Sequence, residues 1–164
     1  MGTTHITVDR FSLTTTKPFD SVMAALDAKV GHPKMPDFTN DVEAASSRAE
    51  VEGIVQRELG ESGFVVFVRF DLGSAIRKEP GPGSSRSVRL LIGNPLIMKE
   101  MVTEVPDAGS YAPVTVLIDE RADGVHLSYD TVASALSHYE NPRASKVARD
   151  LDSRVERLLT AASS

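Results

Sequence analysis

The segment from Phe64 to Phe70 reads Phe-Val-Val-Phe-Val-Arg-Phe and constrains the fold more than any other part of the chain. Aromatic and β-branched side chains favour strands, because they pack well on a pleated surface. A nearly unbroken apolar run is typical of a strand that is covered on both faces. We therefore expect this segment to lie at the centre of a sheet.

Four other segments alternate apolar and polar side chains, as half-buried strands do. They are residues 6–13, 88–92, 114–118 and 125–129. The alternation of the first segment changes phase near Arg10, which a bulge or a strand end would explain. The last two segments are joined by residues 119–124, which predict a hairpin with Gly124 at a positive φ.

Apolar residues at helical spacing predict helices over residues 19–30, 51–59 and 143–161. Another helix should begin at Pro95, because Asn94 suits the N-cap and proline suits the first helical position. Residues 34–47 are small and polar, and they predict a loop with a short helix at 39–46. This order of elements predicts one α+β domain over residues 1–164, an antiparallel sheet with its helices on one face.

Composition limits the function. The 164 residues carry 18 basic and 23 acidic side chains and no cysteine. The net charge of -5 argues against a nucleic-acid partner, and the absence of cysteine excludes disulfides and thiol catalysis. Neither a signal peptide nor an apolar run of roughly 20 residues is recognisable. We expect a cytoplasmic protein with no membrane partner.

Several segments come in the order and spacing of one known family: Phe64–Leu72, Ile92-Gly-Asn-Pro-Leu96, Tyr111-Ala-Pro-Val-Thr-Val-Leu-Ile118 and the Asp123-Gly124 hairpin. Over residues 5–130 the chain resembles the domain of unknown function 302 family. The resemblance implies a TATA-binding-protein-like α+β fold, with a curved antiparallel sheet backed by helices on one face, and a homodimer. The resemblance also implies haem as a possible ligand, but it supplies no sequence motif that identifies the residues that would bind it.

Two departures accompany the resemblance. Residues 31–60 form a helical segment that looks inserted into the family core of residues 5–130. The C-terminal helix at 143–161 is longer than that core requires. Either segment can change a pocket or an interface.

No metal or catalytic motif stands out. The histidines are His5, His32, His126 and His138, and their spacing forms no local ligand cluster. The acidic hairpin at 119–124 has the outline of a calcium loop, but strands flank it and Arg121 takes a ligand position. Gly81-Pro-Gly83 lacks the lysine of a phosphate-binding loop, and no nucleophile elbow is present. Catalytic residues therefore stay unassigned.

The second face of the sheet is the most informative feature. If Val88, Leu90 and Ile92 face the helices, the pleat places Arg89 and Leu91 on the opposite side. The same parity places His126 and Ser128 there, and we expect Arg69 to join them. This face is too apolar for free exposure to solvent. We expect a partner subunit, the inserted segment or a ligand to cover it.

The candidate ligand-binding residues are Arg69, Arg89, His126, Ser128 and Asn94. His126 is the best single candidate for a ligand to iron or an organic anion, but a histidine in mid-strand more often has a hydrogen-bonded structural role. The sequence favours a non-catalytic small-molecule-binding or sensing homodimer that takes haem or an organic anion. One alternative is an enzyme for an anionic metabolite, with Arg69, Arg89 and His126 converging in a pocket. Another is a protein–protein interaction module whose C-terminal helix docks a partner.

Overall fold

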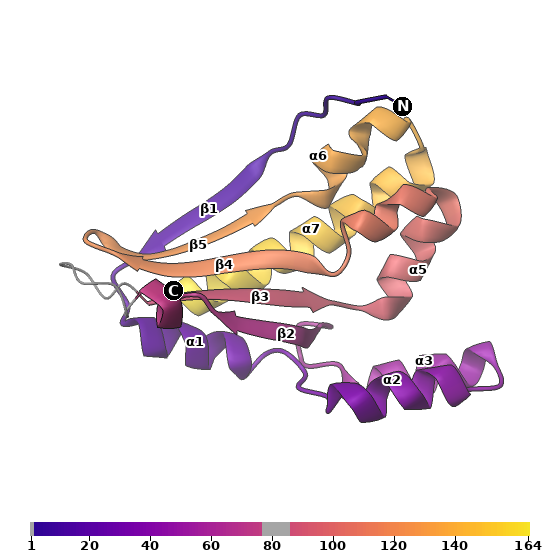
Figure 1. The fold of residues 1–164 in the computed structure, drawn as a ribbon, viewed down its shortest axis with the longest axis horizontal. Coiled ribbons are helices and arrows are strands. Elements are labelled where there is room, and N and C mark those ends of the chain that lie inside the picture. Colours follow the sequence, from indigo (N-terminus) through magenta and orange to yellow (C-terminus); the bar gives the residue numbers. More distant parts are fainter. Residues whose placement is uncertain (1, 77–85) are drawn as a thin grey trace.

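A computed structural model describes residues 2–76 and 86–164 of the chain. Its five-stranded sheet is antiparallel throughout and has the order β1-β5-β4-β3-β2 (Figure 1). The strands are β1 (Arg10–Thr15), β2 (Val65–Asp71), β3 (Ser87–Gly93), β4 (Val114–Arg121) and β5 (Gly124–Asp130). The predicted single α+β domain is confirmed.

The longest helix, α7 (Pro142–Ser163), packs with α1, α5 and α6 behind one face of the sheet (Figure 1). The other helices are α1 (Phe19–Asp27), α2 (Met35–Ala44), α3 (Arg48–Glu58), α4 (Gly73–Ile76), α5 (Pro95–Glu104) and α6 (Val132–Leu136). Short 3₁₀ turns occupy Pro106–Ser110 and Ser137–Tyr139. Within residues 2–76 and 86–164, no helix is long and apolar enough to cross a membrane.

The core lies between the sheet and these helices, and it follows the alternation of the sequence. Alternate residues of β3, β4 and β5 point to the helices and are buried. The helices meet them with an apolar stripe on α7 and with buried side chains of α1, α5 and α6. We call the opposite side of the sheet the outer face.

The strand from Val65 to Asp71 is an edge strand, and the expectation that it lies at the centre is wrong. Phe64 and Val65 are fully buried, but Val68 and Phe70 are 38% and 46% exposed. An apolar run indicates that both faces of a strand carry apolar side chains. It does not indicate whether other strands pair with both edges of that strand, and so it cannot distinguish a central strand from an edge strand.

A bulge in β2 changes which side chains reach the outer face. Val66 pairs with the core residue Ile92, whereas Val68 pairs with Leu91, and the register shifts between them. The extra residue reverses the parity of everything that follows. Val68 and Phe70 therefore lie on the outer face, and Arg69 lies on the helical side.

Other boundaries differ from expectation. The first strand begins at Arg10, so the phase change there marks a strand end, and residues 6–9 precede the strand. The expected loop at 34–47 contains a full helix, α2, which begins at Met35 with Pro36 in its first turn. Its one strongly buried side chain, Phe38, packs on Ile54 and Val55 of α3 in a small separate cluster. The glycine-rich segment at 81–85 lies outside the described residues.

The β4–β5 hairpin depends on Gly124, whose φ of 138° confirms the predicted positive value. A Cβ here would lie 2.5 Å from the carbonyl oxygen of Thr15 on the neighbouring strand. Gly53, in the middle of α3, has no atom within 4 Å of its hypothetical Cβ.

Gly124→Ala should therefore lower the free energy of unfolding by about 2–3 kcal/mol, because it combines backbone strain with a clash. Gly53→Ala should raise it by about 0.5–1 kcal/mol, since alanine favours a helix. Urea unfolding of both variants measures the difference. Equal shifts would contradict the hairpin geometry.

Candidate functional site

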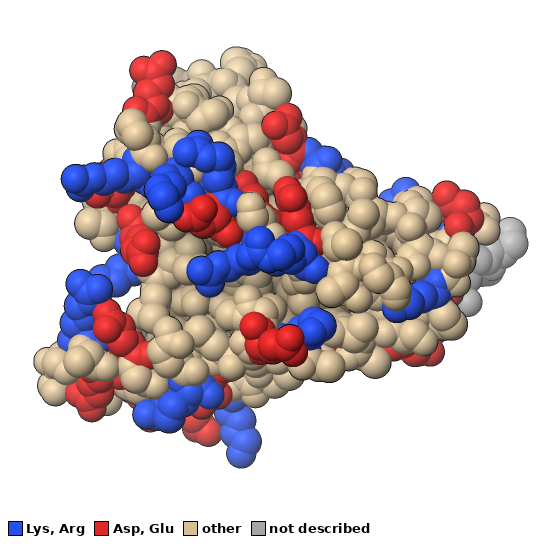
Figure 2. All heavy atoms as spheres, turned by 180° about the vertical axis from the view of Figure 1, so that it is seen from behind, with Lys and Arg blue, Asp and Glu red and all other residues tan. Residues whose placement is uncertain are grey.

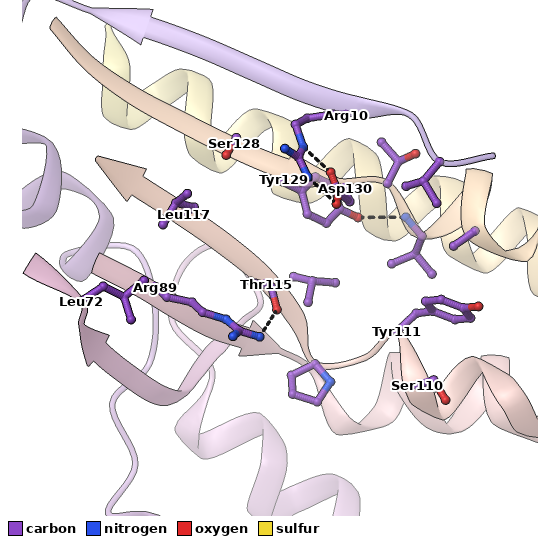
Figure 3. A pocket seen from close by; sticks show the side chains of 16 residues that line it. Arg10, Leu72, Arg89, Ser110, Tyr111, Thr115, Leu117, Ser128, Tyr129 and Asp130 are labelled. Atoms are coloured by element: carbon purple, nitrogen blue, oxygen red, sulfur yellow. Dashed lines mark hydrogen bonds and ion pairs between the residues drawn. The ribbon is translucent and has the colours of Figure 1, made fainter. Parts of the chain in front are cut away.

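The outer face contains a hollow with a cavity volume of about 460 Å³, here called the outer-face hollow. It lies across β3, β4 and β5, toward the end of the sheet where β4 begins and β5 ends (Figure 3). Its lining comprises Val8, Arg10, Leu72, Arg89, Ser110, Tyr111, Pro113, Val114, Thr115, Leu117, Ser128, Tyr129, Asp130, Thr131, Val132 and Ala135. Sites of this size accommodate small molecules.

The walls of the hollow are mainly apolar. Leu72, beyond the end of β2, is 41% exposed, and Leu117 of β4 is half-buried between Arg89 and Ser128 in the strand register. Pro113 and Val8 complete this surface. Exposed apolar side chains gathered beside a few polar groups are typical of binding sites.

Arg89 is the cation that the site leaves available. It extends from β3 across the hollow to the hydroxyl of Thr115, which accepts a hydrogen bond from Nη2 at 3.4 Å (Figure 3). Among the described residues, Arg89 has no carboxylate partner. Its guanidinium therefore keeps most of its donors for another acceptor.

Arg10, the second cation of the lining, is already engaged. Its Nη2 donates to Oδ2 of Asp130 at 2.8 Å, directly across the β1–β5 pair. This hydrogen bond from Arg10 lowers the pKa of the Asp130 carboxyl below its ordinary value. The pair therefore stays charged at neutral pH, and the two charges offset each other at the rim.

A buried hydrogen-bond network closes the α6 end of the hollow. Tyr129 donates its hydroxyl proton to Asp152 of α7, which also accepts from the backbone N–H groups of Val132 and Ala133, each at 2.9 Å. Burial raises the pKa of the Tyr129 hydroxyl, and the Asp152 carboxylate raises it further. Asp152 is 6% exposed, so this network fixes α6 to α7.

Sequence reasoning missed Asp152, although the sequence holds a signal for it. An aspartate stands inside the apolar stripe of the C-terminal helix, next to Leu151. A carboxylate at a buried helix position requires donors around it.

The structure does not bring Arg69, Arg89 and His126 together, which corrects the expected convergence. Arg69 pairs in register with the buried Leu90 and reaches Asp27 at the end of α1, with Nη1 and Oδ2 3.0 Å apart. The β2 bulge is the physical cause, because it moves Arg69 to the helical side.

His126 lies on the outer face, but at the hairpin end of β5 and outside the hollow. Its Nε2 is 2.8 Å from Oδ1 of Asp123, and its Nδ1 is 3.2 Å from the hydroxyl of Thr14. Both ring nitrogens therefore have partners within the chain.

The remaining two candidates, Ser128 and Asn94, lie in different parts of the structure. Ser128 lines the outer-face hollow with Arg89. Asn94 is buried, and it accepts from the N–H of Leu96 at 2.9 Å as the N-cap of α5. Its amide donates to the carbonyl of Gly63 at 3.1 Å, so its side chain holds two segments of the fold together.

Haem, which the family resemblance suggested, would have few protein ligands in this lining. Haem iron takes histidine, cysteine, methionine or tyrosine as its protein ligand. The hollow offers two tyrosines and no other side chain of these types. Tyr129 donates its hydroxyl to Asp152, which leaves Tyr111 as the one side chain of the lining that could bind the iron. In the described ranges, no three histidine, aspartate or glutamate side chains are grouped to hold a metal ion.

The fold and the hollow define an α+β domain whose sheet is covered by helices on one side and carries a small-molecule-sized site on the other. A family model described as "Domain of unknown function DUF302" matches residues 40–162, and the chain belongs to this family. The matched region includes α7.

The crystal structure of the uncharacterized conserved protein DUF302 from Bacillus stearothermophilus is similar, with a TM-score of 0.64 and 12% identity. The similarity covers 93% of this chain and 97% of that one. At this identity it supports the fold alone. No curated protein matches the sequence.

Proposed function

We propose that the protein is a non-catalytic small-molecule-binding protein that takes an organic anion in the outer-face hollow. The observation that carries this proposal is Arg89, a cation without a carboxylate partner among the described residues, beside an apolar wall. An acid with an apolar body would place its carboxylate on Arg89 and its body against Leu72 and Leu117. Arginine suits this role because its fork of donors matches a carboxylate.

Polar groups around Arg89 would define the orientation of the ligand. Thr115 supplies a hydroxyl 3.4 Å from the guanidinium, and Ser128 and Tyr111 supply hydroxyls elsewhere on the lining. The Arg10–Asp130 pair at the rim contributes no net charge, so Arg89 sets the sign of the site.

We also propose that the protein acts as a homodimer, as the family resemblance implies. Support comes from the edge strand β2 and the residue after it, where Val68, Phe70 and Leu72 are all more than a third exposed. A second copy would remove this apolar surface from water. Native mass spectrometry should give twice the 17.7 kDa chain mass.

Isothermal calorimetry with two probe acids, octanoate and 2-naphthoate, tests the binding proposal. Both should bind, and their uncharged amides should bind much more weakly. Arg89→Gln should weaken binding of the acids by about tenfold or more, since a charge-assisted hydrogen bond contributes roughly 1.5–3 kcal/mol.

Arg69→Gln is the matched control. Arg69 lies on the neighbouring strand, one residue before Phe70, which pairs with Arg89, but its side chain is on the helical side. The affinity of this variant for the acids should equal that of the unmodified protein. Equal weakening by Arg69→Gln and Arg89→Gln would reject the hollow as the site, and so would binding of the amides as tightly as the acids.

The two alternatives find less support. The enzyme alternative required Arg69, Arg89 and His126 to converge, and they lie in three separate places. The interaction-module alternative required α7 to be available to a partner. Its apolar stripe is instead buried in the core of the domain, against α5 and α6.

A further inference from the structure

A second hollow of about 460 Å³ lies on the opposite side of the protein, between α7 and the turn that joins α3 to β2. We call it the turn hollow. Its lining is Lys29, Glu61, Ser62, Gly63, Arg154, Arg157, Leu158 and Ala161. The α7 members follow helical spacing, so they share one side of that helix.

Positive charge dominates this lining. Lys29, Arg154 and Arg157 face the single carboxylate of Glu61, although the whole chain carries a net charge of -5. Lys29 and Glu61 pair at 3.2 Å, which leaves the two arginines. Neither arginine has a hydrogen-bond or ion-pair partner within the part of the chain that the structure describes, although Arg154 interacts electrostatically with Asp150, one turn earlier on α7.

The helical side as a whole does not share this excess. Lys and Arg alternate there with Asp and Glu across the surface (Figure 2). Eight of the sixteen Lys and Arg side chains in the described ranges form an ion pair, as Lys146 does with Asp150 at 2.7 Å and Arg143 with Glu104 at 3.3 Å. What distinguishes the turn hollow is that two arginines without an ion pair lie one turn apart on α7 and line it together with a lysine.

The turn itself is held in place and contributes an unused hydroxyl. Gly63 has a φ of 78°, and a methyl group at its Cα would lie 3.4 Å from Nη1 of Arg154. The side-chain amide of Asn94 donates a hydrogen bond to the carbonyl oxygen of Gly63. The Ser62 hydroxyl is buried and has no partner among the described residues, which costs free energy unless an acceptor is supplied.

We propose that the turn hollow binds the phosphate groups of a small soluble molecule, with Arg154 and Arg157 as the main donors and Lys29 as a third cation. Arginine forks match phosphate oxygens with paired hydrogen bonds. Because Glu61 offsets the charge of Lys29, the two arginines give the lining its excess of positive charge, which suits a ligand with more than one negative charge, such as a diphosphate. A concave site of this volume favours a small molecule over a flat anionic surface.

One of these cations, Lys29, also suits a role in helix stabilisation. Lys29 follows the end of α1, where positive charge stabilises a helix C-terminus, whereas Arg157 lies before the last turn of α7 and does not have this role. That role needs no ligand, so direct binding separates the two explanations.

The test is calorimetry with inorganic pyrophosphate at low ionic strength, with the full chain. Pyrophosphate should bind measurably, more tightly than inorganic phosphate, and more weakly as salt is added. Arg154→Gln and Arg157→Gln should each weaken binding by about tenfold. Arg149→Gln is the matched control, because Arg149 is exposed on the same helix but does not line the hollow.

No binding of pyrophosphate, or equal weakening by Arg149→Gln, would overturn the proposal. An additional arm uses vesicles of phosphatidylcholine with phosphatidylglycerol, and binding to these vesicles without pyrophosphate binding would assign the cations to a lipid surface instead. The turn hollow and the outer-face hollow lie on opposite sides of the sheet, so either proposal can fail without the other.

Discussion

Asp152→Ala should lower the free energy of unfolding by about 3 kcal/mol, although it changes no apolar contact of the core. The substitution removes the acceptor for three donors: the Tyr129 hydroxyl and the backbone N–H groups of Val132 and Ala133. Two of these donors are buried, and water cannot replace the carboxylate without opening the α6–α7 contact. Urea-induced unfolding followed by circular dichroism measures the loss.

Asp150→Ala provides the control, because it removes an aspartate from the same helix only two positions away. Asp150 is exposed and pairs with Lys146 at 2.7 Å. Surface pairs of this kind contribute about 0.3–0.5 kcal/mol, so the loss should be several times smaller than for Asp152. Similar losses for both variants would show that the buried network does not stabilise the fold.

Val155→Asp should have the larger effect and leave most molecules unfolded at 25 °C. Val155 is fully buried, where α7 meets the rest of the core. A carboxylate there would lack any partner, and the resulting cost of more than about 4 kcal/mol approaches the whole stability of an ordinary domain. The far-ultraviolet spectrum and the urea transition report this directly.

Ser153→Asp introduces the same side chain two residues earlier, at an exposed position of α7. It should change the free energy of unfolding by less than about 0.5 kcal/mol. If Val155→Asp were tolerated as well as Ser153→Asp, α7 would be peripheral to the core, and its apolar stripe would be available to a partner.

The periodicity of the sequence predicted most of the fold. Alternation identified β3, β4 and β5 with their buried sides, and the Asn94-Pro95 pair located the start of α5. These elements were predictable because each buries one side, so that apolar and polar residues follow the period of the strand or helix along the sequence. The short helix α6 was not predicted, because its position depends on a carboxylate twenty residues away.

The site was less predictable, for a physical reason that β2 illustrates. One inserted residue between Val66 and Val68 reverses the strand's parity, so Arg69 leaves the outer face and Phe70 reaches it. The apolar run indicates neither that bulge nor the position of β2 at the edge of the sheet. Arg89 and Ser128 were placed correctly on the outer face, whereas Tyr111 was not predicted to line the site, because it follows a 3₁₀ turn and not a strand.

The most direct test of the central claim is to locate a bound acid by NMR. Titration of isotopically labelled protein with 2-naphthoate should shift the amide signals of Arg89, Thr115, Leu117 and Ser128 most strongly. The signals of α7 around Arg157 should stay in place. The largest shifts on the helical side, or no saturable shift on the outer face, would contradict the proposal that the outer-face hollow binds organic anions.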